Sequence, residues 1–144
     1  MKTFCRLLWT AVISMALMGC QKDIEPDVVY ELTYANKTEY EVTVTLHGVH
    51  FHPDTVSLVI PSNSEGSVCC YENFGMDRCT MLFEDGRSVV YTETSDMNNG
   101  NPLWYFAYNV VRADEEKPKS GIRMLCSFDI TEDNYNSAQP VVVN

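Results

Sequence analysis

Apolar and polar residues alternate with a period of two through most of this chain after residue 27. The alternation is clearest at 28–34, 40–46 and 122–130, where every second side chain is apolar. Such a pattern is typical of strands that are buried on one face and exposed on the other. A chain of this kind can bury its apolar side chains only by packing one sheet face against another.

Shorter strands are predicted at four more places. They are 56–60, 66–71, 79–83 and 88–92. Asp85-Gly86 predicts a type I′ turn, whose two central residues need positive φ, and this turn should join 79–83 to 88–92 as a hairpin. Pro61 ends the first of these strands, because proline cannot donate to a ladder.

Three further predictions concern how the strands are joined and how the chain ends. The turn at 36–38 predicts a hairpin between 28–34 and 40–46. The segment 104–111 has apolar residues at both odd and even positions, which predicts a central strand covered on both faces. Only 131–138 has helical signals, since Thr131 can cap a helix and the two acidic residues after it favour a helix N-terminus.

About eight short strands without helices between them predict an all-β fold. The specific prediction is an antiparallel, immunoglobulin-like β-sandwich with a short C-terminal helical turn. A small closed β-barrel is the alternative, because it accommodates the same strand pattern.

The first 20 residues predict export and lipidation. Lys2 and Arg6 give a basic start, and the apolar stretch at 7–17 is about half of the roughly 20 residues that a membrane-spanning helix needs. This pattern is typical of a cleaved signal peptide. The sequence Leu17-Met18-Gly19-Cys20 resembles the lipobox of bacterial lipoproteins, in which the chain is cut before the cysteine and lipid is attached to its sulfur.

These signals divide the chain into three parts. Residues 1–19 are the predicted signal peptide, 20–27 contain the lipidated Cys20 and a polar tether, and 28–144 are the predicted β-sandwich domain. Removal of the signal leaves 125 of the 144 residues, which is enough for one domain with its own core.

The lipobox, the partly acidic segment at 21–25 and the β-rich body together resemble small exported lipoproteins of the Bacteroidota. The body shares with uncharacterised domains of that group the Asp85-Gly86 turn and the closing segment 130–135. The resemblance implies a lipid-anchored protein of the outer membrane, on its periplasmic face or at the cell surface. It implies no catalytic residues.

The charge balance limits the partners. The signal takes two of the ten basic residues, which leaves eight against 20 acidic residues and a formal charge of −12. Such a surface repels phosphate backbones and anionic headgroups, so nucleic acid is not expected as a partner. Membrane attachment must then come from the lipid on Cys20, and stable anchoring takes about two acyl chains or signals.

Four cysteines remain in the predicted domain. They are Cys69, Cys70, Cys79 and Cys126. Four cysteines in an exported domain allow two disulfides in three pairings. Cys70 and Cys79 could bridge two strands joined by the loop at 71–78, and Cys126 would then be either a buried thiol or the partner of Cys69. Buried reduced thiols throughout are the alternative. Their spacing is not that of metal ligands.

Two groups of side chains are candidates for a ligand site. His50 and His52 would share one face of a strand and could begin a metal site, with solvated loop histidines as the alternative. Trp104, Tyr105 and Tyr108 are candidates for a ligand surface, with core packing as the alternative, because neighbouring residues of a strand face opposite ways.

The sequence therefore predicts a binding or structural accessory module rather than an enzyme, without a cofactor. It has no G-x-S-x-G motif, and its paired acids are adjacent in turns rather than placed across a cleft. The expected partner is a glycan or another envelope protein. A glycan-binding subunit of a nutrient-uptake system is one alternative, and a small metal-dependent hydrolase is another.

Overall fold

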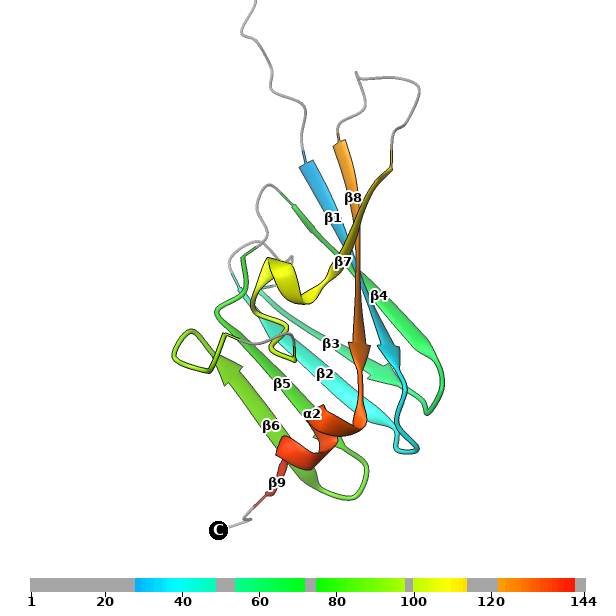
Figure 1. Ribbon diagram of the computed structural model, residues 1–144, viewed down its shortest axis with the longest axis vertical. Coiled ribbons are helices and arrows are strands. Elements are labelled where there is room, and N and C mark those ends of the chain that lie inside the picture. The colour runs from blue at the N-terminus through cyan, green and yellow to red at the C-terminus, as the bar shows by residue number, and fades with distance from the viewer. Residues whose placement is uncertain (1–27, 49–53, 72–74, 98–99, 114–121, 142–144) are drawn as a thin grey trace, which may run out of the picture.

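Two β-sheets pack face to face in this protein (Figure 1). The computed structural model describes residues 28–48, 54–71, 75–97, 100–113 and 122–141. The four-stranded sheet has the order β4-β1-β8-β7, and the five-stranded sheet has the order β3-β2-β5-β6-β9. The predicted all-β sandwich is confirmed, and the described strands form two separate sheets rather than a closed barrel.

The structure contains nine strands, one 3-10 helix and one α-helix in its described part. Their bounds are β1 (Val28–Asn36), β2 (Val42–His47), β3 (Thr55–Ile60), β4 (Glu65–Tyr71), β5 (Arg78–Phe83), β6 (Arg87–Thr92), the 3-10 helix η1 (Tyr105–Ala107), β7 (Asn109–Ala113), β8 (Ile122–Ile130), the α-helix α2 (Glu132–Ser137) and β9 (Gln139–Pro140). The predicted helical turn after β8 is confirmed as α2.

The pairing of β1 with β8 is the one parallel ladder among the described strands. It runs for nine residues, from Val28 opposite Ile122 to Asn36 opposite Ile130. On its other side β1 pairs antiparallel with β4. In this arrangement the first strand of the domain lies in the middle of the four-stranded sheet, between β4 and β8.

The predicted hairpin between the first two strands is wrong. β1 and β2 lie in different sheets, and the turn between them crosses from one sheet to the other. Alternation shows which face of a strand is buried, but it does not show which strand lies beside it. The strand order also differs from that of an immunoglobulin constant domain, where the first two strands share a sheet.

The predicted central strand at 104–111 is also wrong. β7 begins only at Asn109 and is the edge strand beside β8, while the residues before it form η1. The apolar residues at both odd and even positions of this segment have another explanation. Leu103 and Tyr108 are buried in the core, whereas Tyr105 and Phe106 between them are exposed.

The predicted hairpin of β5 and β6 is confirmed, but its turn differs from type I′. The Gly86 N–H donates to the Phe83 carbonyl at 2.9 Å. Gly86 has a φ of 85°, whereas Asp85 is not at positive φ. A three-residue loop with glycine at the last, left-handed position is a common alternative for hairpins.

Two of the buried tyrosines, Tyr34 and Tyr108, are joined by a hydrogen bond in the core between the sheets. Tyr108 donates to the Pro102 carbonyl at 2.8 Å, so Tyr34, whose oxygen lies 2.7 Å from that of Tyr108, donates to Tyr108. Burial raises the pKa of both phenols well above the ordinary value, so both stay neutral.

All buried apolar side chains lie between Leu32 and Ala138, so a chain that starts at Gln21 contains the whole described core.

Asn36 holds the crossing between the two sheets. Its side chain is fully buried, and its Nδ2 donates to the carbonyls of Tyr40, Ile60 and Pro61 at 2.7, 3.0 and 3.1 Å. Its Oδ1 accepts from the Thr38 N–H at 3.0 Å. One side chain at the end of β1 thus satisfies backbone groups at the end of β3 and in the turn that joins β1 to β2.

We predict that Asn36→Ala lowers the free energy of unfolding by about 3 to 5 kcal/mol, because each buried group left unpaired costs about 1 to 3 kcal/mol. Urea unfolding followed by circular dichroism measures this change. Asn136→Ala, at an exposed position of α2, is the matched control and should change stability by less than about 0.5 kcal/mol. Equal effects of the two substitutions would contradict the role of Asn36.

Candidate functional site

The segment from Asn101 to Tyr108 crosses from the five-stranded sheet to the four-stranded sheet. Asn101 is fully buried, and its side chain accepts from the Leu103 N–H at 3.1 Å and donates to the Asp96 carbonyl at 3.0 Å. Leu103 and Tyr108 are buried and anchor the two ends of the crossing. The residues between these anchors are therefore held at the surface.

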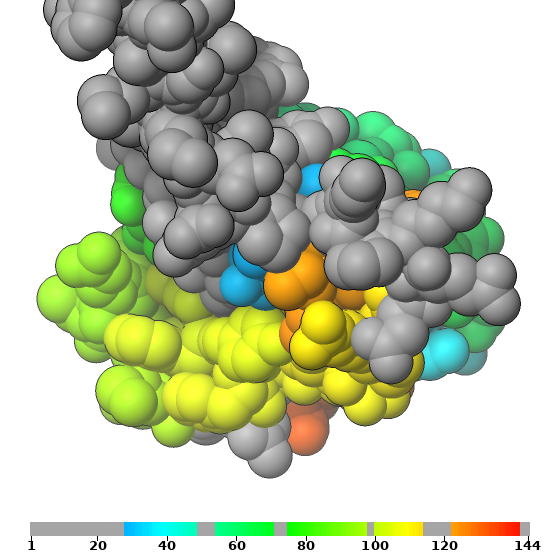
Figure 2. All heavy atoms as spheres, turned by 90° about the horizontal axis from the view of Figure 1, so that it is seen from above, coloured from blue at the N-terminus to red at the C-terminus, as the bar shows by residue number. Residues whose placement is uncertain are grey.

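Three aromatic side chains in this crossing form what we call the aromatic surface: Trp104, Tyr105 and Phe106. Tyr105 is 41% exposed and Phe106 is 53% exposed. The rings of Trp104 and Phe106 are nearly parallel, at 6° and with centroids 6.4 Å apart. Figure 2 shows this segment in yellow on the surface of the sandwich.

A cavity of about 450 Å³ adjoins the aromatic surface, and we call it the aromatic cavity. The described part of its lining is mostly apolar, with one carboxylate. The described lining residues are Gly75, Met76, Glu93, Leu103, Trp104 and Tyr105. Both the volume and the mixture of apolar walls with few polar groups are usual for small-ligand sites. The indole N–H of Trp104 is buried and has no hydrogen-bond partner among the described residues.

The structure separates the three aromatic residues that the sequence singled out. Trp104 and Tyr105 line the aromatic cavity, but Tyr108 is only 6% exposed and packs on Phe128 in the core. Tyr108 therefore belongs to the core and not to a ligand surface. Phe106 is the most exposed of the group and was missed, although the unbroken aromatic run at 104–106 is the signal that marks it.

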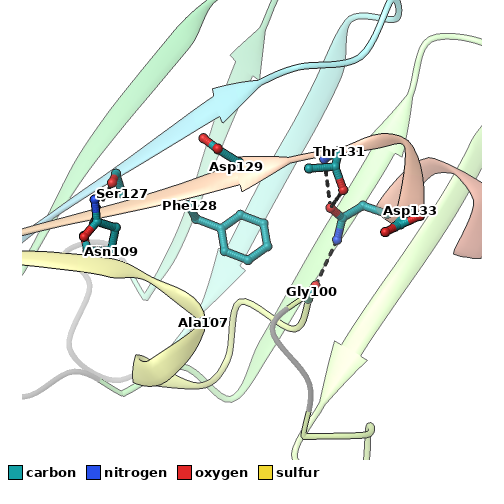
Figure 3. Close-up of a pocket in the computed structure, with 9 residues that line it drawn as sticks. Gly100, Ala107, Asn109, Ser127, Phe128, Asp129, Thr131 and Asp133 are labelled. Carbon is teal, nitrogen blue, oxygen red and sulfur yellow. Dashed lines mark hydrogen bonds between the residues drawn. The ribbon is translucent and has the colours of Figure 1, made fainter.

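A second cavity, of about 490 Å³, lies where the ladder between β7 and β8 ends (Figure 3). Asn134 lines it and is nearly fully buried. Its Nδ2 donates to the Gly100 carbonyl at 2.9 Å and to the Tyr91 hydroxyl at 2.8 Å, and its Oδ1 accepts from the Thr131 N–H at 2.9 Å. These bonds tie α2 to β6 and to the start of the crossing segment, so Asn134 has a structural role.

Cys69, Cys70, Cys79 and Cys126 form no disulfide with one another in the described part of the chain. The possible bridge between Cys70 and Cys79 is not formed; Cys70 is on β4, and Cys79 is on β5 of the other sheet. Cys69 is exposed while Cys126 is buried, so these two face opposite sides of their sheet. Burial raises the pKa of Cys70 to about 12 and that of Cys126 to about 11, and it raises the pKa of Cys79 further.

The two candidate metal ligands, His50 and His52, lie outside the described residues, so the choice between a metal site and solvated histidines stays open. The third histidine, His47, has its Nδ1 3.1 Å from the Thr55 hydroxyl oxygen and its Nε2 3.2 Å from a guanidinium nitrogen of Arg78. In the described part of the chain, no three His, Cys, Asp or Glu side chains gather as metal ligands.

Comparison with protein families and with curated proteins gives no match from which a function could be inferred. No protein-family model matches the chain, and no curated protein matches it either. None of the helices in the described ranges has the length and apolar character needed to cross a membrane. The aromatic surface and its cavity are therefore the features on which a functional argument depends.

We predict that thiol alkylation of the native chain 21–144 at about pH 8 modifies Cys69 rapidly and leaves Cys70, Cys79 and Cys126 unmodified, since burial and a raised pKa keep these thiols protonated and covered. Peptide mass spectrometry measures the sites, and denaturation should expose all four. Cys69→Ser is the control that should take up no reagent in the native state. Recovery of a disulfide-linked peptide pair from the unreduced protein would contradict this account.

Proposed function

We propose that this protein is a lipid-anchored module of the cell envelope that binds a carbohydrate with its aromatic surface. The observation that carries the proposal is the exposure of Tyr105, which lines the aromatic cavity, and of Phe106, whose ring stacks beside that of Trp104. Aromatic side chains that remain exposed at the mouth of a cavity are typical of binding sites. The crossing segment holds them there by burying Leu103 and Tyr108 on either side.

A sugar ring matches this surface chemically. A pyranose has faces of C–H groups, which carry partial positive charge, and an aromatic ring has a negative face that attracts them. The nearly parallel rings of Trp104 and Phe106 offer two such faces in similar orientation. Glu93 supplies a carboxylate at the cavity, and a carboxylate accepts strong hydrogen bonds from sugar hydroxyls.

The lipid anchor accounts for where binding takes place. Cleavage before Cys20 leaves a tether of eight residues, 20–27, which spans at most about 28 Å when extended. A domain held so close to the outer membrane meets glycans of the envelope or polysaccharides passing through an uptake system. Both roles use the same aromatic surface, and both fit a binding or accessory module rather than an enzyme.

We predict that the double substitution Tyr105→Ala and Phe106→Ala weakens polysaccharide binding about tenfold or more, because it removes two contacts each worth about 1 kcal/mol. A glycan array finds the ligand, and calorimetry measures the dissociation constant. Val111→Ala, at a position of β7 that is 55% exposed, is the matched control and should bind normally. Binding that survives the double substitution, or no binding by the unaltered protein across the array, would contradict the proposal.

We predict that the full chain, produced in a bacterial host, incorporates an acyl-chain analogue and enters the detergent phase on phase separation. Cys20→Ala should abolish both, because its sulfur is the proposed lipid attachment point. Cys5→Ala lies within the predicted signal peptide and is the control that should leave both unchanged. Lipid labelling that persists in the Cys20→Ala variant would rule out this anchor.

A further inference from the structure

The aromatic cavity carries a single charge in its described lining, and that charge is negative. It belongs to Glu93, which directly follows β6 and has an exposed side chain. No ion pair or hydrogen bond joins its carboxylate to another residue of the described ranges. A carboxylate only accepts hydrogen bonds, so a ligand that pairs with Glu93 must donate.

The surroundings of the cavity are negative as well. Asp54, Asp77 and Glu93 flank the ends of β3, β5 and β6 that meet at one end of the five-stranded sheet. Arg78 lies at the same end, but its guanidinium contacts His47 on β2, and β5 lies between β2 and β6. Among the described residues at this end, carboxylates outnumber the one guanidinium, in a chain that is acidic as a whole. Such a field attracts cations and repels anionic ligands.

The walls of the cavity suit a positively charged group. Trp104 and Tyr105 bring aromatic rings to it, and the faces of such rings attract ammonium groups. Met76 and Leu103 are buried and add apolar wall. Apolar walls lower the local dielectric constant, which strengthens the attraction between a carboxylate and a cation. Aromatic rings beside a carboxylate are therefore suited to an organic ammonium ion.

We propose that the aromatic cavity binds the protonated amino group of an amino sugar. The ammonium group donates to the carboxylate of Glu93 and lies against the rings of Trp104 and Tyr105, while the sugar ring lies on the aromatic surface. This inference rests on the proposed function, because it assigns the class of carbohydrate that the same site takes.

The charge of the amino group separates this class from other sugars. A hydroxyl in the same place donates to Glu93 but carries no charge, so it gains neither the ion pair nor the attraction of the ring faces. An acetylated amino group has likewise lost its charge. A uronic acid or a sulfated sugar would bring a second negative charge beside Glu93, which is unfavourable.

Three β-1,4-linked tetrasaccharides that differ only at C2 test the proposal: those of glucosamine, glucose and N-acetylglucosamine. Trp104 is the one tryptophan of the chain 21–144, since Trp9 lies in the predicted signal peptide, so tryptophan fluorescence reports binding at this cavity. At about pH 6 alkylamines are protonated and carboxylates are ionised. The glucosamine tetrasaccharide should bind about tenfold more tightly than the other two, because it alone gains the ion pair and the contact of a cation with the rings.

Glu93→Gln keeps the shape of the side chain and removes its charge. It should weaken binding of the glucosamine tetrasaccharide about fivefold and leave binding of the glucose tetrasaccharide unchanged. Glu65→Gln, at an exposed position of β4, makes the same change in net charge on the other sheet and is the matched control. At about 0.15 M salt, which screens distant charges, it should leave all three affinities unchanged.

Two results would overturn this inference and leave the proposed function standing. One is equal affinity for the glucosamine and glucose tetrasaccharides, and the other is an equal loss of glucosamine binding in Glu93→Gln and Glu65→Gln. Binding of none of the three tetrasaccharides would also overturn it, and the glycan array then decides separately on the proposed function.

Discussion

The parallel pairing of β1 with β8 is the constraint on which the rest of the structure depends. These strands are the first and last long strands of the domain, and their nine-residue ladder forms the middle of the four-stranded sheet. β4 and β7 join that sheet only at the outer edges of this pair. Because the pairing joins residues about a hundred positions apart, it demands a large loop closure, which makes such a fold slow to form.

The exposed aromatic residues follow from this arrangement. β6 ends in the five-stranded sheet, while the free edge of β8, to which β7 must pair, is in the other sheet. The chain between β6 and β7 therefore has to cross the side of the sandwich. Leu103 and Tyr108 enter the core on either side of η1, and Asn101 and Asn134 fix the approach through buried hydrogen bonds. Tyr105 and Phe106 face outward because the core positions on both sides of them are already filled.

The sequence predicted the strands well where one face is buried and the other is exposed. β3, β5, β6 and β8 were expected within one or two residues of their observed bounds, and α2 was expected from its capping signals. The choice of neighbouring strand was not predictable, because the same alternation in β1 suits a hairpin with β2 and a ladder with β8. The segment before β7 was misread because a crossing segment with two buried anchors has the same composition as a strand that is buried on both faces.

The candidate site was predicted in part. Trp104 and Tyr105 were expected, whereas the burial of Tyr108 depends on its hydroxyl reaching Pro102 and Tyr34, which no local pattern shows. Disulfides were considered because four cysteines in an exported domain permit two of them, with buried reduced thiols as the alternative. A bridge between Cys70 and Cys79 was considered for two strands joined by the loop at 71–78, whereas β4 and β5 belong to different sheets. The roles of Asn36, Asn101 and Asn134 likewise arise only from tertiary contacts, because each side chain bonds backbone groups of several elements or turns.

Amide hydrogen exchange with and without a bound oligosaccharide tests the central claim, that the crossing segment at 101–108 is the binding element of this sandwich. The account predicts that the ligand slows exchange at residues 103–107 and around Met76, which line the aromatic surface and its cavity, while β3 exchanges at the same rate in both samples. Slowed exchange confined to other parts of the sandwich, with 103–107 unchanged, would contradict it.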